Sequence, residues 1–181
     1  MTPDSPQVRL VTNPALDRRY RHTLDFLAET LPPPAQILDL GTPNPLSRIM
    51  EFEGYHVQNT DVDLDDAPEA VRGKSVEVVT AFEILEHLVA PLNVLRAIDA
   101  PRLFATVPLR LWFAKAYRNP KDEWDRHFHE FEDWQFDWLL AKAGWEIVRR
   151  TKWSSPSTEI GLRPILRRFT PRYYAIEAVR S

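Results

Sequence analysis

The stretch Gln36-Ile37-Leu38-Asp39-Leu40-Gly41-Thr42-Pro43-Asn44-Pro45 decides the fold that this sequence predicts. Apolar residues run into Asp39 and Gly41, and a helical pattern begins at Asn44, so we predict a buried strand, a tight turn and a helix start. Such a βα unit opens a nucleotide-binding sheet. In these sheets the ligand lies at the carboxyl ends of the strands, against a helix N-terminus.

An acidic residue follows the next predicted strand, as a ribose-binding site requires. Asp61 comes directly after residues 55–60 and lies 20 residues beyond Gly41, the separation expected for one βαβ step. We therefore expect Asp61 to accept hydrogen bonds from the ribose hydroxyls of a bound nucleotide.

At these residues the chain resembles the class I S-adenosylmethionine-dependent methyltransferases, whose first motif is apolar-apolar-Asp-x-Gly-x-Gly-x-Gly. Asp39 and Gly41 occupy their motif positions, whereas Pro43 and Pro45 replace the second and third glycines. A later stretch, Phe82-Glu83-Ile84-Leu85-Glu86-His87-Leu88-Val89-Ala90-Pro91, is similar to the Glu-x-x-Glu-His segment of compact small-molecule members of this class.

The resemblance covers residues 35–147 and implies methyl transfer from S-adenosylmethionine to a small-molecule acceptor. It also implies a Rossmann-like three-layer α/β sandwich, with a mostly parallel sheet and an antiparallel pair of strands at the C-terminal edge. Only residues 62–75 separate Asp61 from the next predicted strand, 76–80, so we expect the region of the third strand to be abbreviated. The residues implied in cofactor binding are Asp39, Gly41, Thr42, Asp61, Asp63 and Glu83.

Pro43 keeps a second hypothesis open. A proline ring and a missing N–H change a loop surface that glycine would allow to approach the ligand closely. The alternative is a catalytically inactive, methyltransferase-like binding module. A nicotinamide-dependent oxidoreductase would share the strand, turn and acid, but the sequence lacks the Gly-x-Gly-x-x-Gly that holds a pyrophosphate.

Histidines are the candidate catalytic residues, because removal of a proton from an oxygen acceptor suits a side chain with a near-neutral pKa. His127 and His87 are the first candidates, with His129 behind them. His127 and His129 belong to residues 109–131, an aromatic-rich insert expected to form a lid over the active-site mouth.

No metal is predicted from these patterns. The His-x-His spacing at 127–129 is shared with metal sites, but no second ligand cluster accompanies it in the sequence. A calcium loop begun at Asp61 would need Gly at its sixth and Glu at its twelfth position, where the chain has Asp66 and Arg72. The acids Asp65, Asp66 and Glu69 are therefore expected to form a solvated loop.

The remaining segments are expected to complete one domain over residues 1–181, with a loose tail at 1–12. A helix is predicted from Asn13, and another between Glu132 or Asp133 and Gly144, with Trp134 and Trp138 in the core. Strands at 145–153 and 173–179 are expected to be joined by a loop at 154–172.

Composition excludes several classes of protein. The 181 residues are 44% apolar and 27% charged, without any cysteine, which rules out disulfides, zinc–thiolate sites and thiol catalysis. No apolar run approaches ~18 residues, and no charged-then-apolar leader is seen, so neither a membrane span nor a signal peptide is expected. A cytoplasmic location is the default.

A basic stretch near the C-terminal end is either a solvated surface that balances the acidic N-terminal half or, as a hypothesis, a site for an anionic partner. Arginine suits phosphate and carboxylate, and apolar residues at 162–169 add a surface that fits an anionic small acceptor, a lipid-linked phosphate or a membrane surface. Nucleic acid is not expected, because the net charge is −3 and no recognisable reading element is present. Against one acid, Glu159, the stretch contains Arg149, Arg150, Lys152, Arg163, Arg167, Arg168 and Arg172.

Overall fold

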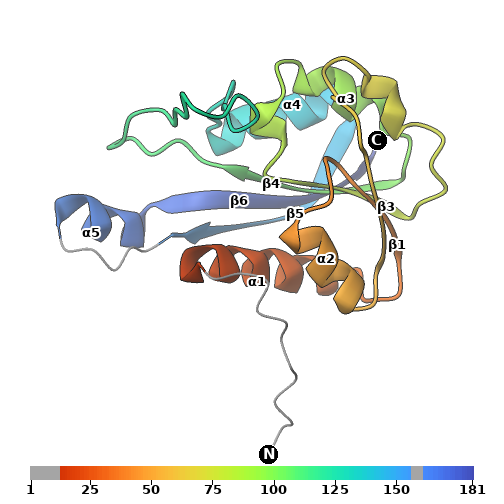
Figure 1. Ribbon diagram of the computed structural model, residues 1–181, viewed down its shortest axis with the longest axis horizontal. Coiled ribbons are helices and arrows are strands. Elements are labelled where there is room, and N and C mark those ends of the chain that lie inside the picture. Colours follow the sequence, from red (N-terminus) through yellow and green to blue (C-terminus); the bar gives the residue numbers. More distant parts are fainter. Residues whose placement is uncertain (1–12, 156–160) are drawn as a thin grey trace, which may run out of the picture.

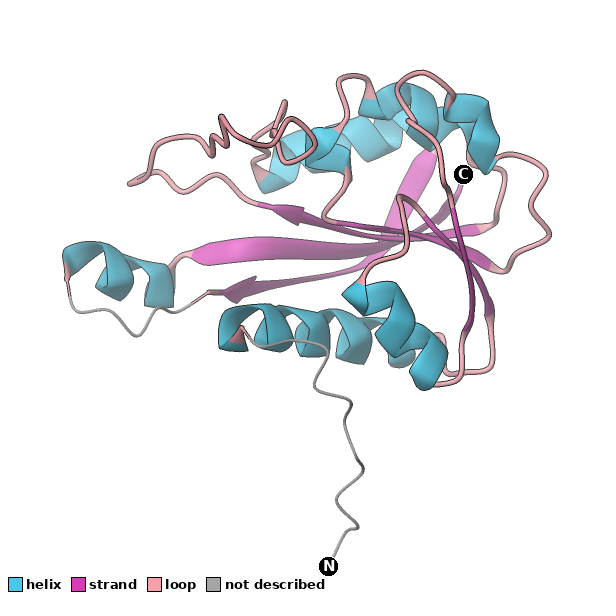
Figure 2. Cartoon of the chain, viewed as in Figure 1, coloured by secondary structure: helices cyan, strands magenta, loops and turns pink. Residues whose placement is uncertain are grey.

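In the computed structural model, which describes residues 13–155 and 161–181, a six-stranded sheet lies between two layers of helices (Figure 1, Figure 2). The tail predicted at 1–12 lies outside the described residues. The strands are β1 (Gln36–Asp39), β2 (His56–Asn59), β3 (Val78–Phe82), β4 (Arg102–Pro108), β5 (Trp145–Ser154) and β6 (Pro171–Arg180). The helices are α1 (Pro14–Ala28), α2 (Pro45–Phe52), α3 (Pro91–Ala97), α4 (Asp133–Ala143) and α5 (Leu162–Phe169), with 3₁₀ turns η1 (Pro68–Val71) and η2 (Leu85–His87).

The strand order is β2-β1-β3-β4-β6-β5, and the first four strands are parallel. The β4–β6 and β5–β6 pairs are antiparallel, so the predicted antiparallel C-terminal edge is confirmed. From β1 the chain continues to β2 on one side, and β3 lies on the other. The carboxyl ends of β1 and β3 are therefore a topological switch point, and it is in the crevice at such a point that α/β sheets bind their ligands.

Both faces of the central strands are buried, which explains their continuous apolar runs. Ile37 and Val78 pack with Phe26 of α1 and Met50 of α2, on the side that these two helices cover. Leu38 and its strand neighbours pack on the opposite side, which α3 and α4 cover (Figure 1). Successive side chains of a strand point to opposite faces of the sheet, so each central strand contributes to both hydrophobic layers.

Helix starts follow the signals in the sequence. Asn13 caps α1, and its side chain accepts the N–H of Ala15 at 3.0 Å. Asn44 caps α2 in a capping box with Ser47, and Pro45 occupies the first helical turn. Pro45 in place of a motif glycine therefore has a structural explanation, because a proline there removes only an N–H that has no helical partner.

The middle of the sheet is shortened as predicted. Between β2 and β3, a stretch that the structure describes in full, the only regular element is η1. β2 consequently forms the edge of the sheet. β3 begins at Val78, two residues later than predicted.

The core face of α4 differs from the prediction. Glu132 caps this helix and Gly144 ends it in the left-handed conformation, as expected. Trp134 and Trp138, however, are exposed and pack on each other, with ring centroids 4.8 Å apart. The buried stripe consists instead of Phe136, Leu140 and Ala143, which lie about two residues further along the helix. Phe136 has no exposed surface, and its ring lies against Tyr174 of β6 with centroids 6.2 Å apart.

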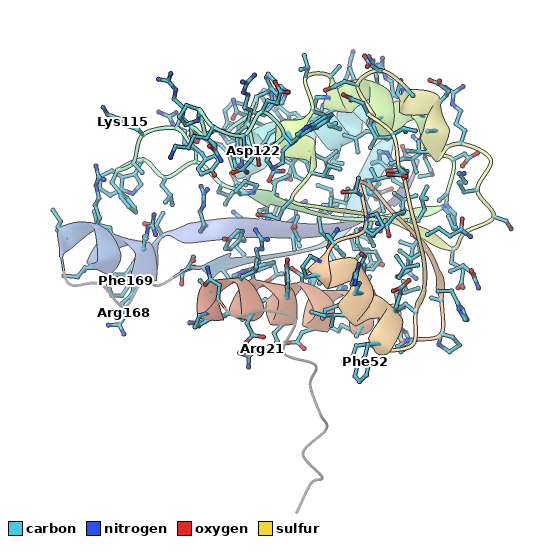
Figure 3. All side chains as sticks on the ribbon, in the orientation of Figure 1. Arg21, Phe52, Lys115, Asp122, Arg168 and Phe169 are labelled. Atoms are coloured by element: carbon cyan, nitrogen blue, oxygen red, sulfur yellow. The ribbon has the colours of Figure 1, made fainter. Side chains whose placement is uncertain are left out.

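The predicted loop at 154–172 contains α5, which the sequence analysis missed. Pro164 suggested a loop, but it occupies the first turn of the helix, where proline is tolerated. α5 lies at the outer end of β5 and β6, and Figure 3 shows Arg168 and Phe169 pointing outward from it. No described helix is long and apolar enough to cross a membrane.

The two aromatic positions of α4 give a direct test of its core face. Phe136→Ala should lower the free energy of unfolding by about 3–5 kcal/mol, because a fully buried ring leaves a cavity. Trp138→Ala should cost less than about 1 kcal/mol, because 69% of that residue is exposed. Urea denaturation followed by circular dichroism compares the two, and equal losses would contradict this assignment of the helix faces.

Candidate functional site

The carboxylate of Asp39 is buried beneath the loop that follows β1. The Thr80 hydroxyl donates to its Oδ1 at 2.6 Å, and the Asn59 amide donates to its Oδ2 at 3.1 Å. Thr80 belongs to β3 and Asn59 to β2, so one carboxylate joins the three strands beside the crevice. Burial raises the pKa of Asp39 to about 6, although these hydrogen bonds oppose the rise.

Gly41 makes the turn above Asp39. Its φ of +97° is rarely adopted by other residues, and a Cβ at this position would lie 2.9 Å from Cδ1 of Ile84. The Gly41 N–H donates to the Thr60 hydroxyl at 2.7 Å, so it is already satisfied within the protein. Any contribution of Gly41 to ligand binding therefore comes from the close approach that its missing side chain allows. Thr42, the next residue, is exposed.

Three acidic residues after β2, Asp61, Asp63 and Asp65, differ in what their side chains contact. Asp61 is exposed at the end of the strand. Asp63 accepts the N–H of Asp65 at 2.9 Å and so shapes a turn. The Asp65 carboxylate accepts the N–H groups of Val89 at 2.8 Å and Ala90 at 2.9 Å. The expectation that Asp65 is a solvated acid is thus wrong, because it anchors this loop to the segment before α3.

Glu83 directly follows β3 and faces α1. Its backbone has φ +54°, unusual for a residue other than glycine and often found at functional sites. Its Oε2 accepts a hydrogen bond from Arg19 at 3.1 Å, while its buried Oε1 has no partner within the described residues. Burial raises the pKa of Glu83, and the positive charge of Arg19 opposes this effect.

Glu86 is a buried carboxylate three residues further on. Only 1% of it is exposed, and its Oε2 has no hydrogen-bond partner among the described residues. Burial, reinforced by the charge of Glu83, raises the pKa of Glu86 well above its usual value. Its carbonyl oxygen accepts the N–H groups of Phe128 at 2.8 Å and His129 at 3.2 Å. These bonds fasten residues 109–131, here called the aromatic segment, onto η2.

His87 and His127 meet where η2 contacts the aromatic segment. Their rings pack edge to face with centroids 4.7 Å apart, and His127 also lies 4.5 Å from the ring of Tyr117. His87 Nδ1 lies 3.0 Å from the carbonyl oxygen of Arg126. Burial lowers the pKa of both histidines, and that of His127 falls to about 4. Both imidazoles are therefore neutral at pH 7.

His129 lies apart from this pair. Its Nε2 is 3.4 Å from the carbonyl oxygen of Val89, and its ring stacks on Phe131 with centroids 5.5 Å apart. It lines a pocket of about 480 Å³ between the aromatic segment, α3 and α4. None of the predicted cofactor residues lines that pocket. The third predicted histidine is therefore not brought to the carboxylates.

Tertiary structure gathers one cluster from three parts of the chain: Glu83, Glu86 and His87 after β3, His127 from the aromatic segment, and Arg19 from α1. Ligand atoms of Glu86, His87 and His127 lie within 4.8 Å of one another. Sequence reasoning omitted Glu86 from the site, although the Glu-x-x-Glu-His spacing contained it. No sequence signal identified Arg19.

Comparison with known proteins places this geometry in a family. The family model of a methyltransferase domain matches residues 13–150. The S-adenosylmethionine-dependent methyltransferase of Mesorhizobium loti is similar with TM-score 0.60 and 15% identity, covering 86% of this chain and 96% of that one. A SAM-dependent methyltransferase of Archaeoglobus fulgidus has TM-score 0.59 and 13% identity, covering 91% and 93%.

A third similar structure is the magnesium protoporphyrin IX methyltransferase of Synechocystis PCC 6803 with bound SAH. Its TM-score is 0.54 at 14% identity, over 92% of this chain and 84% of that one. No curated protein matches the chain in sequence. At these identities the structural matches show the fold alone, which is the Rossmann-like fold of class I methyltransferases.

The family match covers well over half of the chain, so the chain belongs to this methyltransferase family. It is an S-adenosylmethionine-dependent enzyme, as the sequence resemblance predicted.

The shifted pKa of Asp39 predicts how stability depends on pH. The folded chain holds this proton more tightly than the unfolded chain, so the contribution of Asp39 to stability falls as pH rises from about 4 to about 6. A rise of about two pKa units corresponds to about 3 kcal/mol. Urea denaturation at pH 4 and at pH 7 measures this effect. The free energy of unfolding of Asp39→Asn, taken relative to that of wild type, should rise by up to about 3 kcal/mol between the two pH values. If the difference in unfolding free energy between variant and wild type did not change with pH, the pKa of Asp39 would not be raised in the folded chain.

Proposed function

We propose that the chain transfers the methyl group of S-adenosylmethionine to a hydroxyl oxygen of a small acceptor, which binds between η2 and the aromatic segment. One observation carries the proposal: His87 and His127, from segments far apart in the sequence, meet beside the carboxylates of Glu83 and Glu86. Glu83, Glu86 and His87 follow β3, and the carboxyl end of β3 borders the crevice of the sheet. The methyl donor and the polar cluster are thereby neighbours.

We assign the donor's ribose to Asp61, the exposed acid at the end of β2. The loop at Gly41 and Thr42 would lie along the adenosyl and methionine parts, because Gly41 permits close approach. Asp63 has the indirect role of shaping the loop that carries Asp61, since its carboxylate accepts a local N–H. The sulfonium supplies the reactive methyl group, so these residues contribute orientation and removal of water.

The aromatic segment is the proposed lid. Its ends are joined by a bridge between Leu109 and Phe131, and the carbonyl of Glu86 holds it near its C-terminal end, at Phe128 and His129. Trp112 and Trp124 nevertheless remain 72% and 76% exposed. Movement of these rings over a bound acceptor would bury apolar surface and exclude water from the transferring methyl group. Tyr117, which contacts the ring of His127 and donates its hydroxyl to the Asp125 carboxylate, would link the lid to the cluster.

The hypothesis of an anionic acceptor rests on fewer residues than the sequence suggested. Arg149 bonds to Glu177, Arg150 pairs with Asp137 and Lys152 pairs with Asp133, so these cations neutralise local acids. Arg172 is different, because its charge is close enough to lower the pKa of His127. We assign to Arg172 the role of binding the negatively charged group of the acceptor.

Contact with a membrane surface or a lipid-linked acceptor would involve α5 rather than the whole basic stretch. Leu162 and Phe169 are 74% and 81% exposed, and Ile165 lies on the same face of the helix. Arg163, Arg167 and Arg168 occupy other faces. This division into an apolar and a basic side is typical of helices that lie on anionic surfaces.

Donor binding gives the first test of the site. Asp61→Ala should weaken binding of S-adenosylmethionine by about 1.5–3 kcal/mol, the range for a charge-assisted hydrogen bond. Asp66→Ala is the matched control, because Asp66 is exposed on the same loop. Isothermal titration calorimetry measures both, with NAD as the ligand control. Equal losses in the two variants would remove the ribose assignment, and binding of NAD alone would favour an oxidoreductase.

Turnover tests the histidine pair. A panel of small phenols and hydroxy acids, assayed for formation of S-adenosylhomocysteine, identifies an acceptor. With that acceptor, His127→Ala should lower kcat by about 10²–10⁴, because a group acting on the transferred proton is lost, while donor affinity is kept. His56→Gln, an exposed histidine on β2, is the control. Unchanged turnover in His127→Ala would refute the assigned role, and donor binding without turnover of any acceptor would favour the alternative of an inactive binding module.

A further inference from the structure

The cluster at η2 has the composition of a metal site. One carboxylate oxygen of Glu86 and one nitrogen each from His87 and His127 lie within 4.8 Å of one another. Two of these residues come from η2 and the third from the aromatic segment, so the cluster exists only in the folded chain. The sequence had predicted no metal, because His127 and His129 lacked a second group of ligands. Folding supplies that second group.

Glu86 provides an independent sign that a ligand is needed. It is 1% exposed, and its Oε2 has no partner among the described residues. Its Oε1 lies 3.8 Å from Nε2 of His87, too far for a hydrogen bond. Oxygen and nitrogen ligands lie about 2.0–2.2 Å from an ion such as Zn²⁺, and two ligands of one ion are therefore about 3–4 Å apart. The observed separation fits an ion between them.

The orientation of His87 also matches that of a metal ligand. A carbonyl oxygen only accepts hydrogen bonds, so the contact with Arg126 requires the proton of His87 to be on Nδ1. The lone pair is then on Nε2, the nitrogen that faces Glu86. Metal-bound histidines typically donate their other N–H to a carbonyl or carboxylate in this way. On the other side of the cluster, Tyr117 packs on the ring of His127.

We infer that Glu86, His87 and His127 bind a divalent transition-metal ion, with Glu83 as an adjoining carboxylate. Two imidazoles and a carboxylate suit Zn²⁺, Mn²⁺ or Fe²⁺ better than Mg²⁺ or Ca²⁺, which prefer ligand sets made of oxygen alone. Three protein ligands leave coordination positions open for a substrate. The Oε1 of Glu83, three residues before Glu86, is likewise buried without a hydrogen-bond partner among the described residues.

This inference rests on the proposed function and changes the role of His127 in it, because a histidine nitrogen bound to the ion cannot also accept the proton, and the ion activates the hydroxyl instead. The acceptor hydroxyl would coordinate the ion, which lowers the pKa of that hydroxyl and releases its proton to solvent. An oxygen lone pair then forms the bond to the methyl carbon, while the carbon–sulfur bond breaks with its electron pair left on sulfur. The products are the methyl ether, S-adenosylhomocysteine and one proton, so no oxidant or reductant is required. Acceptors with a second oxygen beside the hydroxyl would chelate the ion and bind best.

Metal binding is measured on the full chain after dialysis against EDTA and removal of the chelator. Titration calorimetry with Mn²⁺ and with Zn²⁺ should show one site per chain, and Mg²⁺ should bind at least about tenfold more weakly. Glu86→Gln and His127→Ala should each lose about 10-fold to 100-fold or more in affinity. His129→Gln is the matched control, because His129 lies two residues from His127 and outside the cluster, and its metal affinity should equal that of wild type.

The same samples separate this inference from the proposed function. Binding of S-adenosylmethionine is titrated in the presence of EDTA and should be retained by wild type and by His127→Ala. If donor binds but neither Mn²⁺ nor Zn²⁺ does, the metal site is refuted and methyl transfer stands. Equal metal affinity in wild type, Glu86→Gln and His127→Ala would likewise overturn it. Should Glu86→Gln fail to fold by circular dichroism, His87→Ala replaces it, since that side chain is only partly buried.

Discussion

The carboxylate of Asp39 holds together the ends of β1, β2 and β3, and the geometry of the crevice depends on it. Thr80 and Asn59 bind its two oxygens from the neighbouring strands. Above it, Gly41 makes a turn with φ +97°, and a Cβ at this position would lie 2.9 Å from Cδ1 of Ile84. A buried acid with a raised pKa destabilises the folded chain at neutral pH, so stability and site geometry are in opposition here.

A second constraint is the attachment of the aromatic segment to η2. The carbonyl of Glu86 receives two N–H groups from this segment, and the ring of His87 bonds to the carbonyl of Arg126. These main-chain contacts bring His127 to the end of β3 without regular secondary structure in the segment. Contacts that involve the main chain thus hold the polar cluster in place, while large aromatic rings such as Trp112 and Trp124 stay exposed.

The two carboxylates after β3 illustrate how burial and charge are balanced. Arg19, from a helix about sixty residues earlier, compensates Glu83. Among the residues that the structure describes, Glu86 has no such cation within hydrogen-bond reach, and its Oε2, like Oε1 of Glu83, has no hydrogen-bond partner. A buried polar group without a partner is costly, and carboxyl groups with strongly shifted pKa values cluster at functional sites. The proposed hydroxyl acceptor and the proposed metal ion would each supply a partner for the Glu86 carboxyl.

Much of the fold follows from local patterns. The strand at 36–39, the caps at Asn13, Asn44 and Gly144, and the shortened region after Asp61 are all encoded by residues close in sequence. Periodicity could not choose the buried face of α4, because Trp134 and Phe136 are both apolar and only the shape of the facing layer distinguishes them. Likewise, a proline in the first turn concealed α5.

The sequence by itself determined the class of the protein and the first βαβ unit of its sheet, because a strand, a glycine turn and an acid at fixed spacing are encoded by residues close together in the chain. Only the tertiary structure decided which charged groups meet. It paired Arg149 and Arg150 with acids, turned Asp65 into an anchor, separated His129 from His127, and joined His127 to Glu86 and His87. The physical reason is that such contacts depend on how the chain crosses between layers, and residue spacing along the chain does not record those distances.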